Sequence, residues 1–119
     1  MERSRVAIPE LEMARVRKRL QVFCDRVPPH ARDQVWYDWR VRGNQVTLSE
    51  QRPRWQGAPG EVTSIEFARF QYDPATNSWM LKWSDRNARF HPYKGFESVR
   101  SFERLVDEVD ADPTHIFFG

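Results

Sequence analysis

Arginines that stand close to aromatic rings are the residues of this sequence best suited to binding chemistry. In "WYDWRVR" a tryptophan and two arginines recur at alternate positions, and in "RPRW" two arginines lie just before a tryptophan. Guanidinium groups bind phosphates and exposed rings stack on unpaired bases, which is how some sheet surfaces hold single-stranded nucleic acid. The candidate nucleic-acid-binding residues are Arg40, Arg42, Arg52, Arg54 and Trp55.

The same residues also fit an ordinary exposed sheet surface. Arginine stems can cover neighbouring rings through cation–π contacts while their charged heads stay in water. The net charge of +2 does not by itself indicate a nucleic-acid partner. The sequence alone favours this simpler interpretation, and nucleic-acid binding stands beside it as a hypothesis.

A second candidate surface is the stretch "SWMLKWSDRNARFHPY" at residues 78–93. Pro92 cannot donate to a strand ladder, so the segment around it is predicted to be an edge strand, with His91 and Tyr93 on one side of it. An edge offers unpaired backbone groups to a protein partner or to a second copy of the chain. The alternative, which we favour, is that the apolar tail "HIFFG" covers this edge.

Catalytic, metal and cofactor motifs are absent from the sequence. The three histidines are scattered without the spacing of metal ligands, and no serine-nucleophile or phosphate-loop motif occurs. The acids between Asp107 and Asp112 are interpreted as a solvated helix end. We therefore predict no catalytic residue, no metal and no cofactor. A non-enzymatic binding module is favoured, and a small metal-dependent hydrolase or nuclease is the weakest alternative.

Length and composition predict one domain over residues 1–119. The single cysteine, Cys24, suits a reducing compartment, and the sequence has neither a signal-peptide pattern nor an apolar run of membrane-spanning length. The prediction is a cytoplasmic protein with no membrane partner.

Hydrophobic periodicity predicts the elements that must position these residues. Apolar residues at spacings of three and four indicate helices within residues 9–27 and 101–112, and alternation between them indicates five strands. The mixed pattern of residues 62–72 indicates a strand with a bulge or with cover on both sides. Alternation also predicts that Trp79, Leu81 and Trp83 are buried together. The predicted fold class is α+β: an N-terminal helix, a five-stranded antiparallel meander and a C-terminal helix, with one layer of helices on one sheet face.

Several short motifs together resemble a bacterial family, domain-of-unknown-function family 3024. They are "EQRPRW" at 50–55, the W-x-L-x-W pattern at 79–83, "FHPY" at 90–93 and the ending "EVDADPTHIFFG". Phe90 stands where the resemblance leads us to expect a tryptophan, and Gln51 departs from the tighter form of the first motif. The resemblance implies a single bacterial domain of this size, and it implies no activity.

Overall fold

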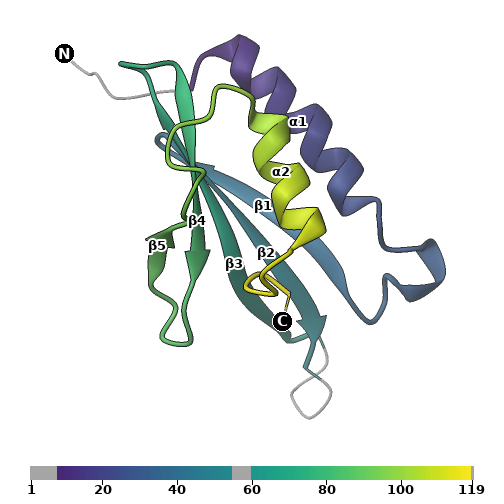
Figure 1. The fold of residues 1–119 in the computed structure, drawn as a ribbon. Helices are drawn as coiled ribbons and strands as arrows, with labels where there is room; N and C mark the ends of the chain where they lie inside the picture. Colours follow the sequence, from purple (N-terminus) through teal and green to yellow (C-terminus); the bar gives the residue numbers. More distant parts are fainter. Residues whose placement is uncertain (1–7, 55–59, 119) are drawn as a thin grey trace.

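The fold is α+β and follows the predicted order: one helix, a five-stranded antiparallel meander and a second helix (Figure 1). The computed structural model describes residues 8–54 and 60–118. The sheet order is β1-β2-β3-β4-β5, so every strand pairs with its sequence neighbour. The elements are α1 (Glu10–Cys24), the short 3-10 helix η1 (Pro29–Ala31), β1 (Trp36–Arg42), β2 (Gln45–Pro53), β3 (Val62–Asp73), β4 (Ser78–Ser84), β5 (Phe90–Pro92) and α2 (Phe102–Ala111).

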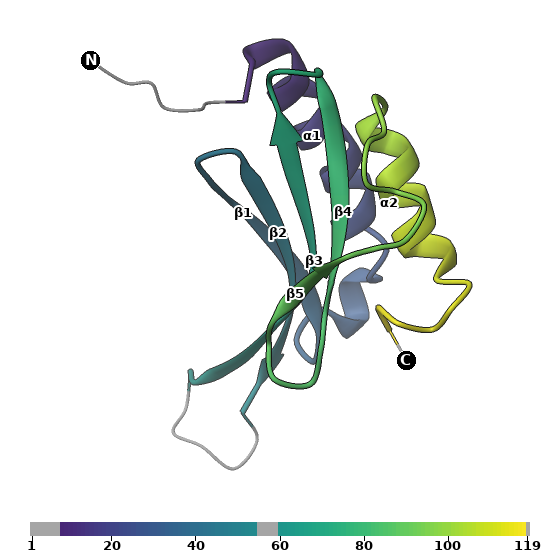
Figure 2. The same cartoon turned by 60° about the vertical axis from the view of Figure 1, so that its left-hand side comes forward.

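Both long helices pack side by side on the same face of the sheet, as Figures 1 and 2 show. The buried side chains of α1 are Val16, Leu20 and Phe23, whose spacing places them on one helical face. Helix α2 is capped at its N-terminus by Ser101, whose hydroxyl accepts the backbone N–H of Arg104 at 3.4 Å. None of the helices in the described residues has the length and apolar character needed to cross a membrane.

The predicted bulge in β3 is present at Phe67. Leu48 pairs with Ala68 while the next residue, Ser49, pairs with Glu66, so Phe67 is the extra residue on β3. The bulge lets Phe67 and Ala68, although adjacent in sequence, both be buried. A strict alternation would have placed one of the two on the opposite face.

The predicted burial of β4 is right for two residues and too strong for the third. Trp79 and Leu81 are completely buried beneath the helices. Trp83 is only half-buried, because it lies near the sheet edge, where its ring neighbour is His91 on β5, at 4.8 Å between centroids.

The segment after α2 folds back onto the helix-covered side of the sheet. Asp112 ends the helix in a left-handed conformation (φ 42°), and its buried carboxylate accepts the backbone N–H groups of Phe117 and Phe118 at 3.0 and 2.9 Å. The ring of Phe117 then packs on Tyr93, and that of Phe118 packs on Phe67. The apolar tail therefore extends the core.

Candidate nucleic-acid interface

The face of the sheet opposite the two helices carries mostly polar side chains. Register defines its residues, because the cross-strand partners of an exposed residue point to the same side. One row runs straight across four strands and contains three cations: Arg40, Thr47, Arg69 and Lys82. At about 4.8 Å per strand, the backbones of Arg40 and Lys82 are roughly 14 Å apart. We call this surface the open face.

Glu66 organises two of the cations on the open face. One of its carboxylate oxygens lies 2.7 Å from a guanidinium nitrogen of Arg40, and the other lies 3.8 Å from Arg69. Arg69 also donates to the Thr47 hydroxyl at 3.0 Å and lies 4.0 Å above the ring of Phe90. Arg69 is thus fixed in place, whereas the Arg40 side chain is still 65% exposed.

Small polar residues form a depression in the middle of the open face. Thr47 and Ser49 are buried although they belong to this face, because longer side chains on neighbouring strands rise around them. The resulting hollow of about 190 Å³ is bordered by Arg40, Glu66 and Gln51. The walls of this hollow are mostly polar and include one cation, Arg40, and two carboxylates, Asp38 and Glu66.

The sequence-predicted nucleic-acid set is divided between the two faces of the sheet. Arg40 and Arg42 lie on the open face. Arg52 lies on the other face, where it pairs with Glu50 at 2.9 Å, and it is about 23 Å along β2 from the residue that pairs with Arg42. Arg54 lies 3.8 Å from Glu61 at the far end of the β2–β3 hairpin, and Trp55 lies outside the described residues.

The structure brings Arg69, Lys82 and Phe90 to the open face, and the predicted nucleic-acid-binding set did not include them. Their grouping depends on pairing across β3, β4 and β5. The signal that could have found them is the register of the β3–β4 hairpin, counted outward from its loop at residues 74–77.

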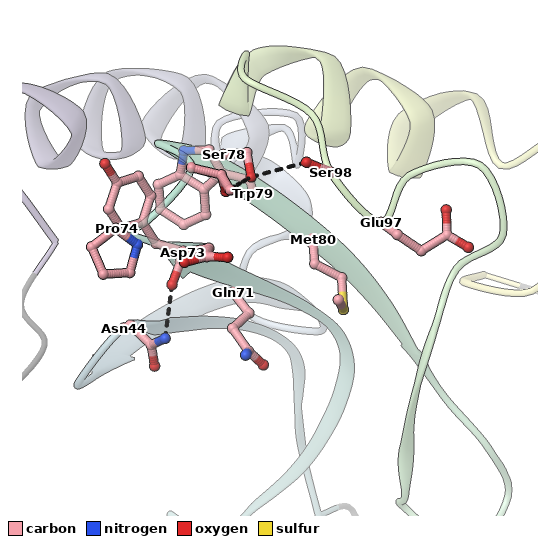
Figure 3. A pocket seen from close by; sticks show the side chains of 11 residues that line it. Asn44, Gln71, Asp73, Pro74, Ser78, Trp79, Met80, Glu97 and Ser98 are labelled. Carbon is pink, nitrogen blue, oxygen red and sulfur yellow. Dashed lines mark hydrogen bonds between the residues drawn. The ribbon is translucent and has the colours of Figure 1, made fainter.

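A pocket larger than the central hollow lies at one end of the open face, between the β3–β4 hairpin and the loop that precedes α2. Its volume is about 380 Å³. Figure 3 shows the side chains of Gln71 and Met80 pointing away from the helices, and Glu97 on the neighbouring loop. The pocket walls also include Asn44 and Asp73. The lining residues come from the ends of β3 and β4, from the β1–β2 and β3–β4 turns and from the loop before α2.

The second predicted surface, His91 with Tyr93, is occupied by internal contacts. Tyr93 is buried, packs on Phe117 and donates its hydroxyl proton to Glu108 at 2.7 Å. Burial, followed by this contact with Glu108, raises the pKa of the Tyr93 hydroxyl. His91 is more exposed and shares a hydrogen bond of 2.7 Å with Asp85. The tail thus packs on the tyrosine of this pair, while the histidine holds the preceding turn.

The acids of α2 serve the packing of the two helices. Asp107 and Asp110 both pair with Arg19 of α1 at 3.0 Å, and Asp110 also pairs with Arg26. Within residues 8–54 and 60–118, no three His, Cys, Asp or Glu side chains converge as metal ligands. Burial, followed by the nearby Asp38 and Asp25, raises the pKa of the Cys24 thiol to about 11, which opposes thiolate chemistry near neutral pH.

The fold and this surface define a small α+β domain whose single sheet has one face covered by helices and one polar face left open. The chain belongs to the family described as Domain of unknown function (DUF3024), whose model matches residues 8–119. Neither the curated proteins nor the solved structures gave a match to this chain.

Proposed function

We propose that the open face binds single-stranded nucleic acid, as a non-enzymatic module. The observation that carries the proposal is the row in which Arg40, Arg69 and Lys82 cross the sheet in register. Cations on a sheet surface contact successive phosphates, and rings at its margins stack on bases. The single thiol of Cys24 fits a reducing cytoplasm, where such a module would act.

Two rings lie on the open face, one on each edge strand of the sheet. Trp36 begins β1, is partly exposed and belongs to the open face through its pairing with Gln51. Phe90 lies on β5 at the opposite edge, beneath Arg69. Stacking on such rings tolerates any base, so affinity depends on backbone charge and only weakly on sequence.

Glu66 gives the proposal a distinctive test, because it neutralises two cations of the row. A phosphate must compete with this carboxylate for Arg40 and Arg69. Glu66→Gln therefore strengthens binding, in contrast to the usual effect of altering a binding surface. Glu10→Gln is the matched control, because Glu10 lies on α1, on the opposite side of the sheet.

The main experiment measures fluorescence anisotropy of labelled decathymidylate with the full chain. We expect log K to fall with log salt at a slope of about −2 to −3, corresponding to three or four phosphate contacts at about −0.7 each. Reversal of Arg40 and Lys82 to glutamate lowers affinity at low salt by at least about tenfold. Reversal of Arg52 and Arg54, which lie off the open face, is the control and has a much smaller effect.

Two results would overturn the proposal. One is the absence of wild-type binding at low salt. The other is a larger loss from the Arg52 and Arg54 reversals than from the Arg40 and Lys82 reversals, which would place the binding surface elsewhere. Circular dichroism of each variant checks that the fold is retained.

A further inference from the structure

The pocket at the end of the open face has more free hydrogen-bond acceptors than donors. Glu97 uses Oε1 to accept the N–H of Gly95 at 3.0 Å, and Asp73 uses Oδ1 to accept the N–H of Ala75 at 2.9 Å. Asn44 donates from Nδ2 to the carbonyl of Tyr72 at 2.8 Å. Among the described residues, the second carboxylate oxygens of Glu97 and Asp73 and the amide oxygen of Asn44 have no further donor, so acceptors predominate.

A neighbouring row on the open face connects this pocket to a cation. The cross-strand register runs Arg42, Gln45, Gln71, Met80, so it begins at a guanidinium and ends in the pocket. Gln45 donates to the amide oxygen of Gln71 at 3.3 Å, which leaves the Gln71 Nε2 group as a donor to a ligand. The row thus offers positive charge at one end and acceptors with negative charge at the other.

A nucleotide has the matching polarity. Its phosphate is anionic, and its base can carry N–H donors. A simple organic cation would satisfy the carboxylates but would gain nothing from Arg42, which has no ion-pair partner among the described residues. Met80 adds a polarizable thioether that can lie against the face of an aromatic ring.

We infer that this pocket binds the base of one nucleotide of a bound strand, and that it selects guanine. Guanine presents two adjacent donors, N1–H and N2–H, along its Watson–Crick edge, whereas thymine presents a single N–H between two carbonyl oxygens. The carboxylate of Glu97, at one wall of the pocket, supplies two oxygens that can accept adjacent donors, and it repels the thymine carbonyls. The inference rests on the proposed function and adds a base preference to it.

The test compares decathymidylate with the same oligonucleotide carrying one central guanine, by competition anisotropy on the full chain. We expect the guanine to raise affinity about tenfold, within the range of one good base contact. Glu97→Gln and Gln71→Ala should each remove most of that preference while leaving the affinity for decathymidylate within about twofold. Glu103→Gln, on α2 and outside the pocket, is the control and keeps the preference.

Each outcome separates this inference from the proposed function. Equal, salt-dependent binding of both oligonucleotides by the wild type would overturn guanine selection and leave the proposed function standing. A preference that survives both Glu97→Gln and Gln71→Ala would overturn the assignment to this pocket. Binding of neither oligonucleotide would overturn the proposed function, and this inference with it.

Discussion

The two faces of the same five strands differ in almost every property. On the helix-covered face, Val46, Leu48 and Leu81 are fully buried and belong to one core cluster with apolar residues of both helices. On the open face, the positions between them carry Thr47, Arg69 and Lys82 in one continuous row. Since side chains alternate along a strand, one stretch of sequence encodes both surfaces. The difference indicates that stability resides mainly on one face, which leaves the side chains of the other face less constrained by packing.

Substitutions can test this division directly, and Trp79→Ala should have the largest effect. Trp79 is completely buried, packs against Tyr72 and Phe102, and donates its indole N–H to Glu12 at 3.0 Å. We expect the free energy of unfolding to fall by about 3–5 kcal/mol, the usual loss for a core aromatic. Urea denaturation followed by circular dichroism measures it.

Trp83→Ala is the matched comparison, because Trp83 lies on the same strand and the same face but is only half-buried. We expect a loss of about 1–2 kcal/mol, since part of its surface already contacts water. Equal losses of unfolding free energy for the two substitutions would show that the packed core extends to Trp83, beside β5.

The next largest loss of stability should come from Asp112, which fixes the C-terminal tail. Removing its carboxylate in Asp112→Ala leaves the N–H groups of Phe117 and Phe118 without their acceptor and also places alanine at a positive φ. We expect a loss of about 2–3 kcal/mol. Asp112→Asn, which tolerates this conformation and keeps one acceptor oxygen, should lose less.

The control for the tail is Asp107→Ala, since Asp107 is exposed and its ion pair with Arg19 is worth less than about 1 kcal/mol. Light scattering of a chain lacking residues 114–119 adds a second readout. We expect association, because the tail's rings cover Tyr93, Phe67 and Phe23. A truncated chain that stays monomeric and equally stable would refute a structural role for the tail.

The open face should contribute much less to stability. Arg40→Ala and Lys82→Ala each remove an exposed or partly exposed side chain, and we expect changes of about 0.5 kcal/mol or less in the free energy of unfolding. The same variants should weaken oligonucleotide binding. A loss above about 2 kcal/mol from either substitution would mean that the open face is structural, and the comparison of the two faces would fail.

Element order, fold class and most of the core could be predicted from the sequence, because periods of two and of three to four are local signals. The mixed pattern of β3 even indicated a bulge, which the structure locates at Phe67. The composition of the open face could not be predicted in the same way. Arg52 follows Arg42 closely in sequence but lies on the other face. Arg42 pairs with Gln45, and Arg52 is an odd number of residues further along β2, so its side chain points to the opposite side.

Tertiary contacts explain the remaining differences. Trp83 matches the alternation of Trp79 and Leu81, and its exposure depends on where α2 and the tail stop covering the sheet. Likewise, the sequence pattern of the α2 acids indicates a solvated run, yet Asp110 pairs with Arg19 of α1 and with Arg26 just after α1, both more than eighty residues earlier in the chain. Neither feature has a signal within a short window of sequence.

The smallest effect we predict lies where the covered face becomes exposed, at the β4–β5 turn. The hydrogen bond from His91, followed by the backbone N–H of Arg89, lowers the pKa of Asp85 from its ordinary 3.8 to about 2, with the N–H of Asn87 adding to the effect and partial burial opposing it. A carboxyl group whose pKa is depressed on folding stabilises the fold above its unfolded pKa, and the contribution disappears as the pH falls through the folded pKa. The turn should therefore keep its geometry down to about pH 4 and lose it progressively towards pH 2.

In NMR spectra, the amide signals of Asn87 and Arg89 should shift together with a midpoint near 2, and Asp85→Asn should abolish this titration while leaving Trp79 packed. A midpoint near 3.8 would show that the hydrogen bonds from His91 and the turn amides do not stabilise the Asp85 carboxylate. The β4–β5 turn would then not be fixed by these bonds.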